Sequence, residues 1–170
     1  MNLAIMPDDN GLILKAVTYE DIEILRRWKN ENRQCFFYQD HISEKQQYSW
    51  FTDFSKRKDD FIFILKFIET NIGCIGFRLL DDVIDIYNVI IGDKNFLSKG
   101  FMSIALQTLC SFIKDCYPNE ITVRVLRNNP AIAWYEKNYF KTCYVKEDHI
   151  GMKLDTERFR YIKYKIPECE

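Results

Sequence analysis

Hydrophobic and polar positions follow two periods along this chain, one typical of strands and the other typical of helices. Alternating or continuous apolar runs predict strands at residues 11–17, 61–68, 72–80, 83–92, 120–126, 140–145 and 157–166. Apolar residues three and four positions apart predict helices that begin at Thr18 and Ser43, and two more over about residues 101–117 and 128–138. The first two helices each have an Asp or Gln three positions after their start, which is the pattern of a capping box.

The order of these elements predicts how the strands pair. Short polar turns join the strands at residues 61–68, 72–80 and 83–92, which favours antiparallel hairpins. The strand at residues 120–126 follows a helix, so we expect it to run parallel to its neighbour. The pattern therefore predicts an α/β (α+β) fold, with a mixed sheet flanked by helices. No repeat or linker interrupts the chain, and we expect residues 1–170 to form one domain.

Composition and charge narrow the class of protein. The 170 residues are 47% hydrophobic and 29% charged, as in ordinary globular domains. The formal net charge of -1 does not require a strongly basic surface, so we expect no nucleic-acid partner. No apolar run approaches the roughly 20 residues of a membrane span, so we expect no membrane association. The six cysteines form no Cys-x-x-Cys pair, which favours reduced thiols, no metal site and a cytoplasmic location.

Residues 96–113 form a polar turn that runs directly into an apolar helix. Lys99 and Gly100 stand where this helix begins. The N–H groups of a first helical turn have no internal partners, and together they attract an anion. Two interpretations stay open from these residues alone: a connector capped by Ser98, or a loop that wraps a phosphate.

Two motifs resemble the GNAT superfamily of acetyl-CoA-dependent N-acetyltransferases. The phosphate loop of that family reads Gln/Arg-x-x-Gly-x-Gly/Ala and is similar to residues 97–102. Gly100 matches its central glycine, whereas Leu97 and Met102 replace the two outer residues. The order of predicted strands and helices also resembles that of the family.

The second motif is the more specific of the two and covers residues 123–140. It is similar to a family pattern of a strand, then Asn-x-x-Ala-x-x-x-Tyr-Glu-Lys, then Gly-Phe. Asn128 and Tyr135 stand at the Asn and Tyr of this pattern, and Tyr139 replaces its glycine. The resemblance implies a mostly antiparallel, seven-stranded mixed sheet flanked by about four helices, with a splayed pair of parallel strands.

The resemblance also implies a reaction and residues that perform it. An acetyl group would move from acetyl-CoA, the co-substrate, to a primary amine by direct attack, without a metal. Tyr135 would protonate the CoA sulfur, and Asp85 would act as base. The alternative for Asp85 is a solvent-facing position without a catalytic role. The implied cofactor-binding residues are Val89, Ile90, Ile91, Leu97, Ser98, Lys99, Gly100, Phe101, Met102, Ser103 and Asn128.

Residues 25–51 carry the information about the acceptor. They are similar to the first two helices of two branches, one acting on nucleotide-linked amino sugars and one on ribosomal-protein N-termini. We expect a small amine, such as an amino sugar, and a monomer or a homodimer. A protein N-terminal acetyltransferase and a non-catalytic acyl-CoA-binding sensor remain as alternatives. The expected acceptor-binding residues are Trp28, Phe36, Phe37, His41, Tyr87 and Asn88.

Overall fold

The computed structural model describes residues 3–8 and 11–167, which form one mixed sheet with helices on both faces. Within these residues the strand order is β7-β8-β6-β5-β4-β3-β2-β1-β9. The strands are β1 (Ala4–Pro7), β2 (Leu12–Ala16), β3 (Asp60–Phe67), β4 (Thr70–Leu79), β5 (Val83–Ile91), β6 (Glu120–Leu126), β7 (Phe140–Val145), β8 (His149–Leu154) and β9 (Tyr164–Lys165). The α-helices are α1 (Ile22–Glu31), α2 (Glu44–Phe54), α3 (Phe101–Cys116) and α4 (Ala131–Lys137). Short 3-10 turns occupy Tyr19–Asp21, Arg33–Cys35 and Lys94–Phe96.

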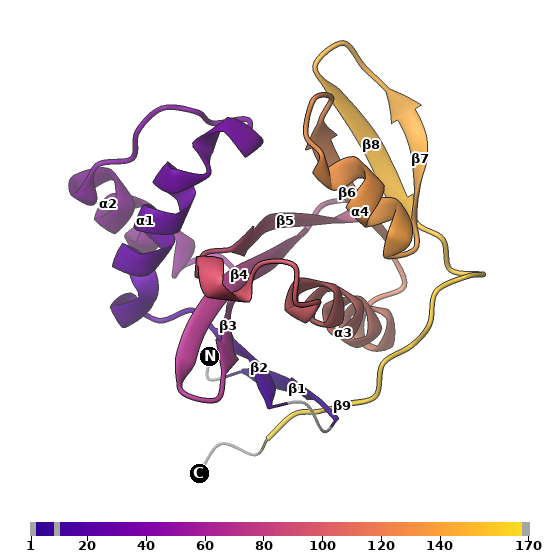
Figure 1. The fold of residues 1–170 in the computed structure, drawn as a ribbon, viewed down its shortest axis with the longest axis horizontal. Coiled ribbons are helices and arrows are strands. Elements are labelled where there is room, and N and C mark those ends of the chain that lie inside the picture. Colours follow the sequence, from indigo (N-terminus) through magenta and orange to yellow (C-terminus); the bar gives the residue numbers. More distant parts are fainter. Residues whose placement is uncertain (1–2, 9–10, 168–170) are drawn as a thin grey trace.

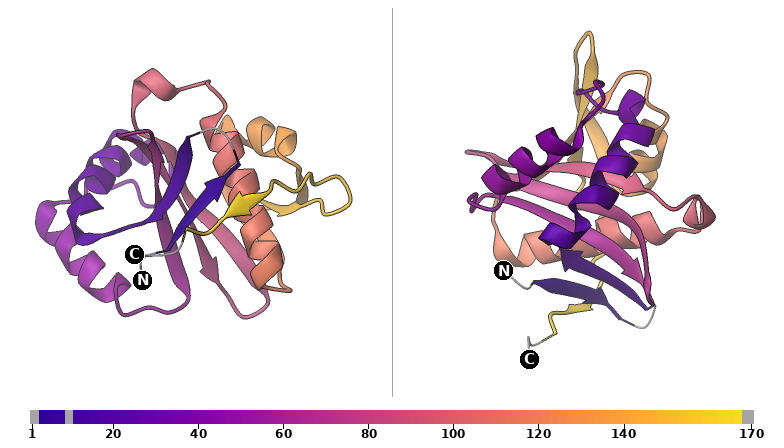
Figure 2. Two further views of the ribbon diagram at one scale, coloured as in Figure 1. Left: turned by 90° about the horizontal axis from the view of Figure 1, so that it is seen from below. Right: turned by 90° about the vertical axis from the view of Figure 1, so that its left-hand side faces the viewer.

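The helices cover the two faces of the sheet in pairs. α1 and α2 lie on one face, and α3 and α4 lie on the other (Figure 1 and Figure 2). The alternation along β3 explains this arrangement: Ile62 and Ile64 pack with α1 and α2, whereas Phe63 and Leu65 pack with α3. Both faces of the central strands are therefore buried. None of the helices within the described residues is long and apolar enough to span a membrane.

Capping boxes fix the start of the first two helical segments, as predicted. The backbone N–H of Thr18 donates to Asp21 Oδ2 at 2.9 Å, at the 3-10 turn that leads into α1. The backbone N–H of Ser43 donates to Gln46 Oε1 at 2.8 Å, at the start of α2. Each pair satisfies N–H groups that a helix start leaves without partners.

The parallel strands β5 and β6 separate halfway along their length, which confirms the predicted splayed pair. Their pairing runs from Val83 and Glu120 to Ile86 and Val123. Among the described residues, β5 then continues to Ile91 without a hydrogen-bonded neighbour on this side, and the second half of β6 pairs with β8 alone. The sheet therefore opens between these two strands.

A bulge in β5 lies where the strands separate. Asn88 and Val89 together stand opposite the single residue Ile75 of β4, since Tyr87 pairs with Gly76 and Ile90 pairs with Cys74. Asn88 has φ 52°, in the left-handed region. An extra residue of this kind bends a strand and increases its twist. The bulge thus contributes to the opening between β5 and β6.

The strand count is a correction to the sequence analysis, because the described part of the chain forms a sheet of nine strands rather than seven. β1 and β8 were not predicted, and only Tyr164–Lys165 of the predicted strand at residues 157–166 is a strand. The preceding segment instead crosses α3: the N–H of Ile162 donates to Ser111 Oγ, and the hydroxyl of Tyr161 donates to Asp115. The alternating side chains of this segment therefore contact the surface of α3 rather than extend the sheet.

Candidate active site

The opening between β5 and β6 leads into a cleft of about 1050 Å³. Its walls come from β5, β6, the start of α3, α4 and the loop after α1; Figure 1 shows α1 on one side of this region and α4 on the other. The predicted site residues that line it are Phe36, Phe37, Asp85, Tyr87, Asn88, Val89, Ile91, Leu97, Ser98, Gly100, Phe101, Met102, Ser103 and Tyr135. Those outside its lining are Trp28, His41, Ile90, Lys99 and Asn128.

The first turn of α3 presents free N–H groups to the cleft. Gly100 is the N-cap residue, with φ 84°, and no side chain caps the helix. A Cβ on Gly100 would have nothing within 4 Å, so the space beside this backbone is open. The positive end of a 16-residue helix, open backbone and uncapped N–H groups together suit a phosphate. Ser98, the alternative cap, lines the cleft but does not cap the helix.

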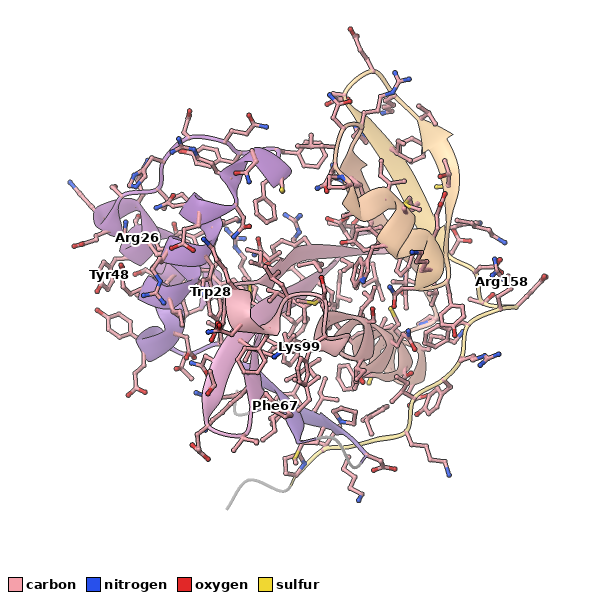
Figure 3. The ribbon with its side chains drawn as sticks, in the orientation of Figure 1. Arg26, Trp28, Tyr48, Phe67, Lys99 and Arg158 are labelled. Atoms are coloured by element: carbon pink, nitrogen blue, oxygen red, sulfur yellow. The ribbon has the colours of Figure 1, made fainter. Side chains whose placement is uncertain are left out.

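The residues around Gly100 differ in how they face the cleft. Leu97 is 52% exposed and forms part of the cleft wall. Met102 is only 8% exposed and belongs to the main core, so most of its bulk points away from the open space. Lys99, predicted to bind the cofactor, lies outside the lining; its Nζ is 5.4 Å from the centroid of the Phe96 ring (Figure 3).

The outer half of β5 presents alternate residues to the cleft. Val89 and Ile91 line it, whereas Ile90 is 5% exposed and packs in the cluster beneath α1 and α2. The side chain of Ile90 therefore does not contact the cleft in which the cofactor is predicted to bind.

Tyr135 of α4 lies at the same cleft, as predicted. Its side chain is 5% exposed, and its ring centroid is 4.8 Å from that of Trp134 and 5.5 Å from that of Phe140. Burial raises the pKa of the phenol above its usual value, and the neighbouring Cys110 and Asp85 act in the same direction. The phenol therefore stays protonated at neutral pH, as a proton donor must.

Asn129, rather than the predicted Asn128, lines the cleft. Asn128 is exposed and lies outside the cleft lining. Asn129 Oδ1 accepts from the N–H of Ala131, and its Nδ2 donates to the carbonyl of Cys35 at 3.2 Å. The second contact joins the start of α4 to the loop after α1 across the cleft.

A row of charged side chains crosses the sheet on the α1–α2 side. Strand pairing places Asp60 beside Arg78 and Arg78 beside Asp85. Arg78 donates to Asp85 Oδ2 at 2.9 Å, and Arg124 of β6 approaches the same oxygen at 3.5 Å. Arg57 donates to Asp60 at 2.8 Å. All five residues line the cleft, and the sequence analysis had assigned a role only to Asp85.

Asp85 is buried at 3% exposure, which contradicts the solvent-facing alternative. Its Oδ2 is shared by the two arginines, while its Oδ1 has no partner among the described residues. Tyr87 lies next to it in the row: its hydroxyl donates to Asp60, and the guanidinium carbon of Arg78 is 4.2 Å from its ring centroid. Burial raises the pKa of Tyr87, and the Asp60 carboxylate adds to this effect, so this phenol also stays neutral.

The loop after α1 supplies the predicted aromatic residues. Phe36 and Phe37 line the cleft, and Phe37 lies 5.8 Å from the guanidinium of Arg124. His41 instead lies outside it, exposed and hydrogen-bonded to Asn30. Trp28, predicted to contact the acceptor, is a core residue with 2% exposure (Figure 3).

A smaller cavity of about 280 Å³ adjoins the cleft between α1, α2 and the sheet. Lys29, Tyr38, Trp50 and Asn88 line both spaces, and Gln47 lines only the smaller one. The sequence analysis assigned no role to Lys29 or Gln47. Within the described residues, no group of three or more His, Cys, Asp or Glu side chains is placed to hold a metal.

Comparisons with known proteins assign the family. The acetyltransferase (GNAT) domain family matches residues 11–140, so this chain belongs to the GNAT acetyltransferases, enzymes that depend on acetyl-CoA. No curated protein sequence matches the chain.

Solved structures share the fold at low sequence identity. The chain is similar to FdhC, a nucleotide-linked sugar GNAT, with 13% identity, a TM-score of 0.75, and 94% of this chain and 92% of that one covered. It is similar to RimL, a ribosomal L7/L12 alpha-N-protein acetyltransferase in complex with coenzyme A, with 16% identity, a TM-score of 0.70 and coverage of 89% and 98%. It is also similar to a mutant of the spermidine N-acetyltransferase SpeG from Vibrio cholerae, with 14% identity, a TM-score of 0.71, and 93% of this chain and 95% of that one covered. These neighbours have different acceptors, so the shared fold does not identify the acceptor here.

Proposed function

We propose that this N-acetyltransferase moves the acetyl group of acetyl-CoA to the primary amine of a small molecule, such as an amino sugar. One observation carries the proposal: the uncapped first turn of α3, the unpaired edge of β5 and the buried phenol of Tyr135 all face one cleft. The first attracts a diphosphate, the second offers main-chain groups to an extended arm, and the third supplies a proton.

Each step of the reaction then has a residue in this cleft. The N–H groups at the start of α3, from Phe101 to Ser103, hold the diphosphate. Main-chain groups of β5 between Val89 and Ile91 hold the pantetheine arm and stabilise charge on the carbonyl oxygen. Asp85, through its free Oδ1, accepts the proton of the attacking amine, and Tyr135 protonates the departing sulfur.

The shape of the acceptor side supports a small amine. Asn129 and Cys35 join the two walls of the cleft, and Phe37 contacts both Arg124 and His149 beyond this contact. We expect the acceptor to approach from this side, where the contacts between the two walls favour a small molecule over the N-terminus of a folded protein.

Two measurements test the proposal in order. Acetyl-CoA at 100 times its dissociation constant is expected to raise the free energy of unfolding by about 2.7 kcal/mol, seen as a higher melting temperature. A panel of amines and amino sugars is then screened for release of free CoA. No thermal shift at millimolar acetyl-CoA refutes the proposed cleft. A thermal shift with no release from any amine refutes catalysis and favours the acyl-CoA sensor.

A further inference from the structure

The part of the cleft left for the acceptor is rich in positive charge. Its lining carries Lys29, Arg57, Arg78 and Arg124, but only two acidic residues, Asp60 and Asp85. Both carboxylates already pair with arginines. Among the described lining residues, no acidic group remains to receive a second cation. A polyamine would therefore meet repulsion here, whereas an acceptor that carries an anion would be attracted.

Lys29 is the cation that lacks a charged partner. It projects from α1, lines both the cleft and the smaller cavity, and makes no ion pair with a described residue. Its Nζ lies 5.7 Å from the centroid of the Phe36 ring. Burial lowers the pKa of Lys29 and Arg78 acts in the same direction, whereas Cys74 and Asp60 act in the opposite direction. A half-buried ammonium group next to a guanidinium is stabilised by an anion placed between them.

Two further polar groups at the smaller cavity also lack partners. Gln47 is 6% exposed and Asn88 is 9% exposed, and both line this cavity. The side-chain amide of neither residue makes a hydrogen bond to another described residue. Buried amides are normally hydrogen-bonded, so these two are suited to bind the polar part of a ligand.

We infer that the acceptor amine carries a phosphate or carboxylate, which Lys29 binds where the cleft meets the smaller cavity, with Gln47 and Asn88 as neutral hydrogen-bond partners. This inference rests on the proposed function and specifies its acceptor class. The amine of such a molecule can then reach Asp85 while its anion remains at Lys29. Phosphate and carboxylate offer the same chemistry to a lysine, so the experiment distinguishes between them.

The test compares amine acceptors with and without an anionic group. Glucosamine is paired with glucosamine 6-phosphate and with a nucleoside-diphosphate-linked amino sugar; phenethylamine is paired with phenylalanine; spermidine represents the polycations. Each is assayed with saturating acetyl-CoA by release of free CoA. The anionic member of at least one pair is expected to have a kcat/KM about 10-fold or more above its neutral partner. A preference for spermidine or for the neutral members overturns the inference.

Variants of Lys29 then locate the anion. Lys29→Gln is expected to raise the KM of the preferred acceptor about 10- to 100-fold and to leave the KM of acetyl-CoA unchanged. Lys29→Arg, which keeps the charge, restores most of the affinity. Lys45→Gln, an exposed lysine of α2 outside both cavities, is the matched control and has no effect. Equal KM values for Lys29→Gln and the control overturn the inference.

A binding measurement keeps the inference testable without a turned-over acceptor. Inorganic phosphate is titrated into the CoA-bound protein, and the melting temperature is followed. Phosphate is expected to raise it in the wild type and in Lys45→Gln, but not in Lys29→Gln. Absence of a shift in the wild type, or the same shift in Lys29→Gln, refutes the anion site. Failure of acetyl-CoA itself to bind would instead refute the proposed function.

Discussion

Arg78 and Asp85 face each other across the β4–β5 hairpin, and an Arg78 guanidinium nitrogen donates to Asp85 Oδ2 at 2.9 Å. Arg124 approaches the same oxygen from β6, so Asp85 is linked to both of its neighbouring strands. The contacts hold one oxygen of the carboxylate in place and leave the other free. This arrangement joins β5 to β6 below the point of separation, and Asp85 lines the cleft there.

Asp85→Asn tests whether this carboxylate acts on the proton of the amine. Removal of the charge is expected to lower kcat about 100-fold or more, since a positioned base contributes roughly 10²–10⁴. It also weakens two charged contacts, which lowers the free energy of unfolding by about 1–3 kcal/mol. Steady-state kinetics and urea denaturation measure the two effects separately.

The control for Asp85→Asn is Asp155→Asn. Asp155 also pairs with a cation, Lys141 at 3.3 Å, but lies outside the cleft. Its substitution is expected to change stability and not kcat. Normal turnover by folded Asp85→Asn would remove Asp85 from the role of base and leave it a structural residue.

Tyr135→Phe tests the proton donor. The variant keeps the ring that packs against Trp134 and Phe140, so the fold and the affinity for acetyl-CoA are expected to persist. Loss of the hydroxyl is expected to slow CoA release about 10²-fold or more at saturating substrates. The comparison needs kcat from the thiol assay and the dissociation constant from calorimetry. An unchanged kcat would show that the sulfur leaves without this phenol.

Raised phenol pKa values predict how stability depends on pH. Tyr87 and Tyr135 keep their protons in the folded protein, whereas unfolded tyrosines ionise near a pKa of about 10. The folded state therefore binds more protons above this pH, and the free energy of unfolding is expected to fall as pH rises beyond about 10. The fall is expected to be shallower in Tyr135→Phe, which lacks one of the groups that keep their protons on folding. Identical slopes in urea titrations of the two proteins would contradict the assignment.

Gly100→Ala tests two reasons for a glycine at the start of α3: its left-handed φ and the open space beside the uncapped N–H groups. The left-handed φ of 84° is expected to cost an alanine about 1–2 kcal/mol of stability. The added methyl group also enters the open space beside the uncapped N–H groups, so affinity for acetyl-CoA falls. Gly11→Ala is the matched control, since Gly11 has φ 70° but lies outside the cleft. The control is expected to lose stability alone; equal affinity for acetyl-CoA in both variants would argue against a phosphate at α3.

Local patterns in the sequence were sufficient for part of the fold. The capping boxes at Thr18 and Ser43 and the hairpins of β3 to β5 rest on residues close together in the chain. The family resemblance, rather than a local pattern, implied the site role of Tyr135, which lines the cleft. β1 and β9 are short strands at one end of the sheet, where β9 pairs with β1 and β1 pairs also with β2, so their own sequences carry little signal.

The charged row and the bulge needed three-dimensional information. Arg78 and Asp85 meet only once the register of the hairpin is known, and Arg124 comes from a strand much later in the chain. The bulge occurs at Asn88, which adopts φ 52° without the glycine that would have marked it. Pairing between distant segments decides these features, and the local pattern does not encode it.

The packing of Trp28 against Gly92 is another contact between distant segments that the local sequence does not encode, and it can be tested by mutation. A Cβ on Gly92, just after β5, would lie 2.1 Å from a ring atom of Trp28, so the indole fills the space that the glycine leaves. Gly92→Ala is expected to lower the free energy of unfolding by about 1–3 kcal/mol, as for other overpacked sites. Trp28→Leu alone opens a cavity and costs a similar amount or more.

The double variant shows whether Gly92→Ala and Trp28→Leu change the free energy of unfolding through one shared space or independently of each other. If the alanine and the indole compete for one space, Gly92→Ala with Trp28→Leu costs less than the two single changes together, by about 0.5–3 kcal/mol. Urea denaturation of the four proteins measures this coupling. Gly151→Ala, whose Cβ would meet Tyr144 at 2.2 Å, is the control, because it is expected to add to Trp28→Leu without coupling. Strict additivity for Gly92 and Trp28 would contradict the close contact that places Trp28 in the core rather than at the acceptor.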